Sequence, residues 1–592
     1  MTIPRGRHPR LPCPSAYARE PFGPPSLGLT VMTPAALADA ILAAVHAACA
    51  SGAISLAAQE IPAEIKIERP RNRDHGDYAT NIAMILAKPA GMSPRDVAAV
   101  LAGRLTEVEG IKSVDIAGPG FLNITLSADA HGELARTIVT AGPAYGRSTD
   151  LVGTRINLEF ISANPTGPLH LGHSRWAACG DALARVLEAS GAEVAREFYV
   201  NDLGVQMDRF AESLMAVADG RAVDKDGYHG AYIVEISAAI VADDPTILEL
   251  PDEERLAGFR EAGYQRQLTS QQDVLELFHT HFDVWYSERK LHNSGAVERG
   301  FAKLRSQGHV YEADGAVWLR TTDFGDDKDR VLIKADGELT YFASDTAYYV
   351  DKRSRGFDIC IYMLGADHHG YVNRLRAVAA CAGDDQDYNI EVLIGQLVKM
   401  MKGGQEVRLS KRAGNIITLE DLIDEVGVDA ARYTLIRYPV DSPLVLDLDL
   451  LVQRSNDNPV YYVQYAHARI SSVLRNAVDL GIVPEDQTRW SSDDFDPSLL
   501  VHERESNLLG ALGEFPRVVR AAAELREPHR VARYLEELAT AYHRFYDVCR
   551  VLPMGDEEIQ PLNVARVWLC AAARQTLANG LGVLGVTAPT RM

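Results

Sequence analysis

The chain has 592 residues, of which 47% are hydrophobic and 24% charged, a composition typical of a folded globular protein with about two to four domains. Its formal net charge of −21 excludes a general nucleic-acid coat, but not a specific nucleic-acid partner held by local basic patches. No apolar run approaches the ~20 residues of a membrane span, so no membrane role is expected.

Residues 1–31 differ from the rest of the chain because they contain seven prolines and four arginines against one acid. Prolines at this density prevent a helix, and the segment lacks the apolar core of a secretory signal. We interpret it as a disordered tail or a start codon assigned too early, rather than a transit peptide or an RNA-binding arm. Met32 is followed by Thr33 and Pro34, which are typical first residues of a helix.

Residues 32–147 are predicted to form a small α/β domain. Apolar residues between 37 and 48 recur at helical spacing, and residues 65–67 alternate as in a strand. A second strand is expected at residues 121–126, after a Gly-Pro-Gly turn. The glycines and proline of residues 142–146 then indicate a linker.

The next region, residues 150–435, begins as a βαβ unit and so predicts a parallel sheet. Its expected order is strand 155–161, turn 164–168, helix 172–190 and strand 194–200. A mostly helical insertion is expected at about 205–330. Strands are expected to return at 359–364 and 392–398, with a helix at 372–382 between them.

Residues 436–592 are predicted to be helical. Their clearest pattern is an apolar stripe on one helix face, which includes Val531, Leu538, Tyr542 and Phe545. The seven cysteines of the chain never occur as Cys-x-x-Cys, which disfavours a disulfide framework and a thiolate zinc site.

The segment most informative about function is residues 162–173, which lie between a predicted strand and a predicted helix. The N-terminus of a helix favours a phosphate at this place in an α/β sheet. His170 and His173 add two donors for a reacting phosphoryl group, and Gly172 leaves room for a flat base beside the backbone. Core packing, a metal site and a simple turn are alternatives. The neighbouring prolines and the lack of acidic or cysteine partners make the first two less favourable.

A second cluster, residues 408–415, follows the glycines of 401–404 and carries three cations. A glycine-flanked basic loop of this kind suits a clamp for a polyphosphate leaving group, although a solvated basic loop is an equal alternative for this segment by itself.

Together these segments resemble the two signature motifs of class I aminoacyl-tRNA synthetases. His170-Leu171-Gly172-His173 resembles the HIGH motif, and Arg408-Leu409-Ser410-Lys411-Arg412 resembles KMSKS with arginine in place of the first lysine. Further stretches look like arginyl-tRNA synthetases, namely residues 75–81, 159–168, 199–204, 365–370, 410–415, 429–432 and 456–467.

This resemblance implies a Rossmann-type α/β catalytic core at 150–435. It also implies a small α/β N-terminal domain at 32–147 that contacts tRNA, and an all-helical anticodon-binding domain at 436–592. The activity it implies is arginine–tRNA ligation, in which ATP activates L-arginine to arginyl-adenylate and the arginyl group passes to the terminal adenosine of tRNA(Arg). ATP and Mg²⁺ would enter as the substrate complex, with no structural metal. A monomer in the cytoplasm is expected from the same family.

The resemblance also assigns roles to individual residues. The catalytic group is His170, His173, Arg408, Ser410 and Lys411; the ATP contacts are Gly172, Gly365, Asp367 and His368; the arginine contacts are Glu159, Asn164, Tyr341 and Asp345; the tRNA contacts are Tyr78, Asn81 and Tyr542. The histidines would stabilise the α-phosphate in the transition state, and Lys411 with Arg408 would neutralise the departing pyrophosphate.

In the arginine subsite, the ring of Tyr341 would pack on the guanidinium and the Asp345 carboxylate would accept its planar fork. Glu159 and Asn164 would hold the backbone amine and neighbouring groups. Without the resemblance, Asp345 is better interpreted as a helix N-cap or a surface acid. The ring of Tyr542 also fits the core-facing stripe.

Two alternatives are a smaller nucleotidyltransferase with a His-x-Gly-His loop and a synthetase-like RNA-binding protein without activity. The size of the helical C-terminal region disfavours the first. The presence of both histidines and Lys411 disfavours the second.

Overall fold

The computed structural model describes residues 32–63, 65–70, 75–407 and 417–592. The proline-rich segment and the basic cluster with Arg408, Ser410 and Lys411 therefore lie outside the described residues.

The N-terminal region is built around an antiparallel sheet of order β1-β3-β2. Thr33 caps the first helix by accepting a hydrogen bond from Ala36 N at 3.1 Å, as its sequence predicts. The strand predicted at 65–67 is wrong, since only Glu68 pairs there, as an isolated bridge with Ala79. The elements are α1 (Pro34–Ala50), η1 (Ala58–Glu60), β1 (Tyr78–Thr80), α2 (Ile82–Ala90), α3 (Pro94–Leu105), β2 (Ile111–Ala117), β3 (Phe121–Leu126), α4 (Ala128–Ala141) and η3 (Gly142–Ala144).

The central region contains a parallel five-stranded sheet of order β11-β10-β4-β5-β6. Its first elements are β4 (Arg155–Glu159), α5 (Leu171–Ala189), β5 (Glu193–Val200), α6 (Val205–Ala218), α7 (Ala231–Asp243), η4 (Pro245–Glu249), α8 (Asp252–Leu277), β6 (Val284–Ser287), α9 (Glu288–Asn293) and α10 (Ala296–Ser306). They are followed by β7 (Val310–Ala313), β8 (Ala316–Leu319), η5 (Thr321–Phe324), β9 (Arg330–Ile333), α11 (Tyr341–Ser354), β10 (Ile359–Gly365), η6 (Ala366–Tyr371), α12 (Val372–Cys381) and β11 (Ile390–Gly395).

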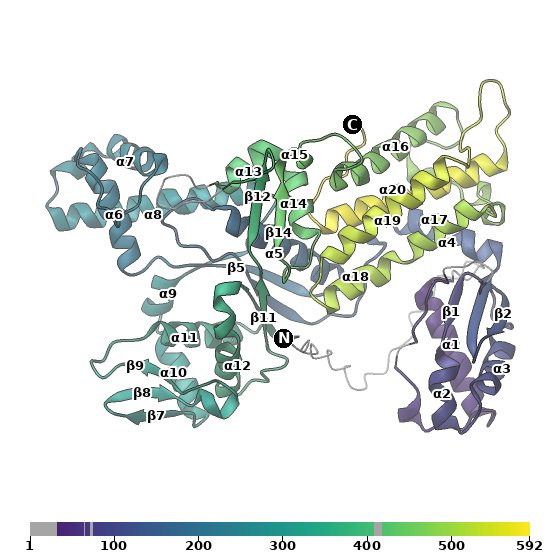
Figure 1. Cartoon of the computed structure of the whole chain (residues 1–592), viewed down its shortest axis with the longest axis horizontal. Coiled ribbons are helices and arrows are strands. Elements are labelled where there is room, and N and C mark those ends of the chain that lie inside the picture. Colours follow the sequence, from purple (N-terminus) through teal and green to yellow (C-terminus); the bar gives the residue numbers. More distant parts are fainter. Residues whose placement is uncertain (1–31, 64, 71–74, 408–416) are drawn as a thin grey trace.

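This region corrects one expectation. The interval 205–330 is mostly helical, as expected, but it is not a single insertion, because β6 belongs to the parallel sheet and β7, β8 and β9 form a separate antiparallel sheet. Three helices, α6, α7 and α8, form the part that projects from the body (Figure 1). The predicted βαβ unit and the strands and helix at 359–398 are confirmed within a few residues.

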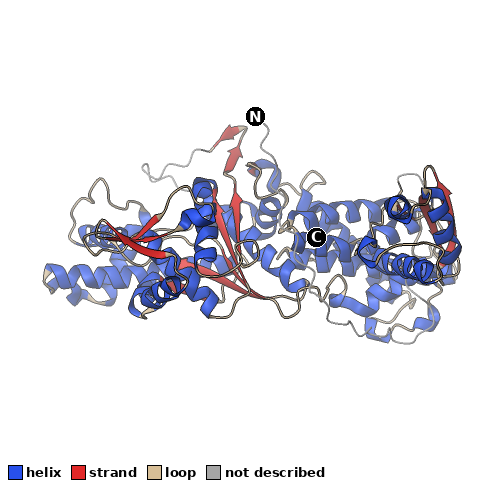
Figure 2. Cartoon of the chain, turned by 90° about the horizontal axis from the view of Figure 1, so that it is seen from below, coloured by secondary structure: helices blue, strands red, loops and turns tan. Residues whose placement is uncertain are grey.

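The C-terminal region is helical after a short mixed sheet. Its elements are β12 (Val398–Lys402), β13 (Gln405–Glu406), α13 (Leu419–Val426), α14 (Val428–Ile436), β14 (Leu444–Asp447), α15 (Leu448–Leu451), α16 (Pro459–Asp479), η8 (Gln487–Arg489), η9 (Ser492–Asp494), η10 (Pro497–Leu499), α17 (Glu503–Gly513), α18 (Phe515–Glu524), α19 (His529–Tyr546) and α20 (Pro561–Val583). Residues 436–592 are not wholly helical, since β14 pairs in parallel with β12. Figure 2 shows these helices between the main sheet and the small N-terminal sheet.

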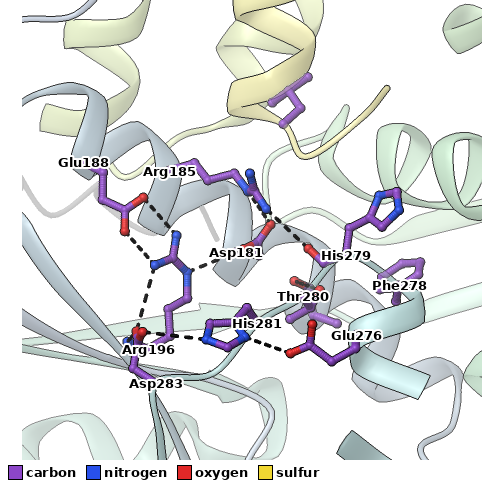
Figure 3. Close-up of polar contacts among 12 residues, drawn as sticks. Asp181, Arg185, Glu188, Arg196, Glu276, Phe278, His279, Thr280, His281 and Asp283 are labelled. Carbon is purple, nitrogen blue, oxygen red and sulfur yellow. Dashed lines mark hydrogen bonds and ion pairs between the residues drawn. The ribbon is translucent and has the colours of Figure 1, made fainter. Parts of the chain in front are cut away.

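A buried arginine joins the main sheet to the C-terminal helices. Arg432 on α14 is fully buried and pairs with Asp181 on α5 at 2.5 Å. Its guanidinium also donates to the carbonyl oxygens of Phe278 at 2.8 Å and of Leu584, just after α20, at 3.0 Å. Figure 3 shows that Asp181 also faces Arg196, at 3.5 Å. One side chain therefore connects three segments that are distant in the sequence.

Replacing Arg432 by methionine should lower the free energy of unfolding by about 3–5 kcal/mol, because the buried Asp181 carboxylate loses its closest partner. Urea denaturation measures the change. The matched control is Arg437→Met at the end of the same helix, whose ion pair with Glu536 at 2.7 Å is partly exposed, so about 1 kcal/mol or less is expected. Equal losses in both variants would contradict the importance of burial at Arg432.

Candidate active site

The predicted ATP and arginine contacts in the described part of the chain lie mostly around the carboxyl ends of the parallel strands. The chain passes from β4 to β5 and β6 on one side, and returns later to place β10 and β11 on the other. The crevice between β4 and β10 is therefore the topological switch point, where open α/β sheets bind ligands. Glu159 ends β4 and Gly365 ends β10, so both border this crevice.

The backbone after β4 is strained. Ile161 and Ser162 have φ values of 69° and 47°, in the left-handed region that non-glycine residues rarely adopt. Ser162 Oγ donates to Glu159 at 3.0 Å and accepts from Tyr199 N at 3.2 Å, so neighbouring strands hold this conformation in place. The chain then turns through residues 164–168 to the start of α5.

His170 and His173 lie at the start of α5 with their rings stacked, 3.8 Å between centroids. His170 Nδ1 accepts from Gly172 N at 3.1 Å, and His173 Nδ1 accepts from His170 N at 3.2 Å. A backbone amide can only donate, so each Nδ1 must be unprotonated and each Nε2 must carry the hydrogen. The turn thus fixes two imidazoles as Nε2–H donors beside a helix N-terminus.

Gly172 is required by this arrangement. A Cβ atom at this position would lie 2.9 Å from Cε1 of His170, so a side chain would displace the ring. In the structure, Gly172 therefore leaves room for the ring of His170, which differs from the predicted role of leaving room for a base.

The segment after the basic cluster is paired with the histidine turn. Leu171 N donates to Ile417 O at 3.2 Å, and Leu419 N donates to Leu169 O at 2.8 Å. His170 and Thr418 form an isolated antiparallel bridge between these contacts. Arg408, Ser410 and Lys411 are outside the described residues, but the chain that follows them is fixed beside His170.

Two carboxyl groups, those of Glu288 on α9 and Asp345 on α11, lie near each other in the site. The pKa of Glu288 is raised to about 7, chiefly by burial and in smaller part by the nearby Asp345 and Asp202 carboxylates. The pKa of Asp345 is likewise raised, to about 6: burial is the main cause, the hydrogen bond from Tyr371 opposes it, and the charge of Glu159 contributes to the increase. Acidic groups with raised pKa values in one crevice form a site suited to a cation.

Glu288 was not predicted from the sequence. It opens α9 directly after β6, and a carboxylate at the end of a parallel strand is the signal that could have identified it. Asp345 is neither a helix N-cap nor a surface acid. Thr340 caps α11 instead, and Asp345 is partly buried in the second turn.

Glu159 is buried and pairs with Lys352, a cation that was not predicted from the sequence. Its Oε2 pairs at 2.5 Å with Nζ of Lys352, which is fully buried. The ammonium group lies 3.8 Å from the ring centroid of Tyr362 and 4.0 Å from Glu197. Lys352 lies two turns after Asp345 on α11, so one helix contacts both sides of the crevice.

The remaining predicted substrate contacts are more open. Asn164 Nδ2 donates to Gln206 Oε1 at 2.6 Å. Asp367 and His368 are exposed in η6, directly after β10. The Tyr341 side chain is 86% exposed, so its ring does not pack within the crevice as expected.

The predicted tRNA contacts are separated from this site and two of them are unsuited to base stacking. Tyr78 and Tyr542 are 2% and 0% exposed, because their rings complete the N-terminal and C-terminal cores. The core position that the apolar stripe predicts for Tyr542 is therefore confirmed. The prediction that the rings of Tyr78 and Tyr542 contact tRNA directly is wrong, because both rings are buried. Asn81 is partly exposed before α2.

No group of three His, Cys, Asp or Glu side chains in the described part of the chain could hold a metal ion. Among the described helices, none is long and apolar enough to cross a membrane.

Comparison with known proteins gives consistent matches along the chain. The family "Arginyl tRNA synthetase N terminal domain" matches residues 35–126. "tRNA synthetases class I (R), catalytic domain" matches 146–227 and 263–437, and "DALR anticodon binding domain" matches 463–592.

The relatives are similar over nearly their full length. The arginine–tRNA ligase of Frankia alni is 59% identical over 561 residues, covering 95% of this chain and 100% of the relative. That of Kineococcus radiotolerans is 58% identical with the same coverage. The structure of Thermus thermophilus arginyl-tRNA synthetase shares the fold, with a TM-score of 0.72 at 22% identity, covering 95% of this chain and 100% of that one.

Proposed function

The chain belongs to the arginyl-tRNA synthetase family and is an arginine–tRNA ligase, and we propose how its residues divide the work of the reaction. The observation that carries the proposal is the position of two fixed Nε2–H donors and a pair of carboxyl groups around one switch-point crevice. The donors suit a phosphate, and the carboxyl groups suit a cationic side chain.

We propose that His170 and His173 contact the α-phosphate of ATP, which enters with Mg²⁺ as a substrate. The carboxylate of arginine attacks this phosphorus, the bond to the pyrophosphate breaks, and negative charge increases on the non-bridging oxygens. Two donors that are already oriented stabilise that charge without reorganisation during the step. Lys411, with Arg408 and Ser410, is proposed to neutralise the departing pyrophosphate. Gly172, Gly365, Asp367 and His368 complete the nucleotide site.

For arginine, we propose that Asp345 and Glu288 accept the guanidinium fork, while Glu159 and Asn164 face the backbone amine. Tyr341 is proposed to cover the guanidinium only after its exposed side chain rotates inward. The planar fork matches a pair of carboxylates, whereas the compact ammonium of lysine does not use this geometry.

For tRNA(Arg), we propose that the helical C-terminal region supplies the anticodon contacts and the N-terminal region, through Asn81, an additional one. A pocket of about 520 Å³ between α16 and α20 contains Arg475, Arg574 and Trp490, together with Glu485 and Asp486. Among the described residues, no carboxylate forms an ion pair with either arginine. Guanidinium groups beside an aromatic ring suit a phosphate and an unstacked base.

We propose three working units, at 32–147, 150–435 and 436–592, and a single cytoplasmic chain as the active form. Sedimentation of the active enzyme measures its oligomeric state.

Pyrophosphate exchange tests the proposed roles directly. The full-length protein is assayed with ATP, Mg²⁺ and a panel of amino acids, with and without tRNA(Arg). Arginine alone of the panel should support exchange. Exchange with lysine or glutamate but not arginine would contradict the specificity, and exchange with no amino acid would contradict the enzymatic activity.

Arginine binding should release protons between about pH 5.5 and 7, because Glu288 and Asp345 have raised pKa values that a bound guanidinium lowers. The affinity should therefore rise with pH through this window and become constant above about pH 8. Titration calorimetry in two buffers of different ionisation enthalpy measures the proton release. An affinity independent of pH across the window would exclude these carboxyl groups as guanidinium ligands.

A further inference from the structure

The turn between β4 and the two histidines, residues 164–168, is held by side chains from the projecting helices. Gln271 Nε2 on α8 donates to the carbonyl oxygens of Asn164 at 3.1 Å and Gly167 at 2.9 Å. Tyr232 on α7 donates through its hydroxyl to Thr166 O at 3.1 Å. Two helices therefore hold three of the carbonyl groups of a five-residue turn.

These contacts are built into the fold. Gln271 is only 1% exposed, so bulk water cannot reach its amide and take the place of the two carbonyl groups as hydrogen-bond acceptor. Burial raises the pKa of the Tyr232 phenol, so the hydroxyl stays protonated and remains a donor. A Cβ at Gly167 would lie 3.4 Å from the Tyr232 hydroxyl, so the turn and the helix are closely packed.

The positions of these carbonyls explain why the turn needs external support. Asn164 and Gly167 each precede a proline, so their peptide groups carry no N–H and offer only an acceptor. The Thr166–Gly167 peptide is trans, so holding the Thr166 oxygen toward α7 directs the Gly167 N–H to the opposite side. Gln271 and Tyr232 thus fix peptide groups that the turn itself cannot fix.

The far end of the turn leads directly to the catalytic histidines. Leu169 O is held by Leu419 N, and the next residue, His170, is the N-cap of α5. The projecting helices therefore hold the first half of the connection from β4 to α5, while residues 417–419 hold the second. A displacement of about 1 Å in such a connection is enough to cost a factor of ~10² in rate.

We propose that Tyr232 and Gln271 are positioning residues for adenylate formation, which orient the histidines through the 164–168 turn. The proposal rests on the roles proposed above for His170 and His173. Tyr232 lies in the stretch 228–262 that the family's catalytic-domain match omits, whereas Gln271 lies within the match, so the Tyr232 contact supports the turn from outside the matched ranges.

Kinetics of pyrophosphate exchange provide the first test. Tyr232→Phe should lower kcat about 3–10-fold and Gln271→Met about 10–100-fold, because each removes buried hydrogen bonds that orient the transition-state donors. KM for arginine should change less than about twofold. The matched control is Tyr228→Phe, whose ring packs on Phe210 and whose hydroxyl forms no hydrogen bond to the turn among the described residues, and it should behave as wild type.

Hydrogen exchange provides a test that does not depend on activity. Peptides covering 162–173 should exchange faster in Tyr232→Phe and Gln271→Met than in wild type, with no change in the affinity for tRNA. If kcat and the hydrogen exchange of residues 162–173 were both unchanged in the variants, the positioning role would be overturned. Hydrogen exchange that is faster in the variants than in a wild type without arginine-dependent activity would instead contradict only the proposed function.

Discussion

Replacing His173 by alanine should reduce arginine-dependent pyrophosphate exchange by about 10²–10³-fold, which is typical for loss of one preorganised donor to a developing oxyanion. The affinity for tRNA should stay within about twofold of wild type, because the ring lies in the crevice and not on the helical surface. Steady-state exchange and filter binding measure the two effects.

The hydrogen-bonding pattern of the turn allows a sharper version of this experiment. His173 uses Nδ1 to accept from His170 N, so Nε2 is the donor that we propose acts on the α-phosphate. A glutamine amide reaches about as far as Nε2 and an asparagine amide about as far as Nδ1. His173→Gln should therefore recover part of the activity, and His173→Asn should not.

The control for both variants is His46→Ala, which removes an exposed histidine from α1 in the N-terminal region. Equal losses of exchange and tRNA affinity in His173→Ala would contradict its assigned role. Equal recovery by asparagine and glutamine would contradict the tautomer.

The parts of this site that the sequence predicts are those in which the determining residues are close together. The strand, turn and helix from 155 to 190 each carry local signals, and the histidines lie within fourteen residues of Glu159, the end of β4. The same is true of the Thr33 cap and the apolar stripe of α19.

The parts that it does not predict depend on distant partners. Lys352 is 193 positions from Glu159, and nothing in its local sequence, between Asp351 and Arg353, indicates that it will be fully buried. Tyr232 and Gln271 likewise contact a turn 66 and 104 positions away, respectively. β6 and β14 are only four residues long, which is too short for an alternation of apolar and polar residues to identify them as strands.

Asp345→Asn should lower kcat/KM for arginine by about 10²–10³-fold, because it removes the charge of one buried ligand while leaving its shape. Glu288→Gln should have an effect of similar size, since the two carboxyl groups face the same cation. In pyrophosphate exchange, the loss should appear mainly in KM for arginine, with KM for ATP within about twofold.

The matched control is Asp351→Asn on the same helix, whose carboxylate pairs with Arg355 at 3.1 Å. It should leave KM for arginine unchanged, which separates loss of a ligand from a general change in α11. The double variant Asp345→Asn with Glu288→Gln should be less damaging than the product of the single effects, because each single variant leaves one carboxylate holding the guanidinium unevenly. A loss confined to KM for ATP would place these carboxyl groups in the nucleotide site and contradict their role in recognising arginine.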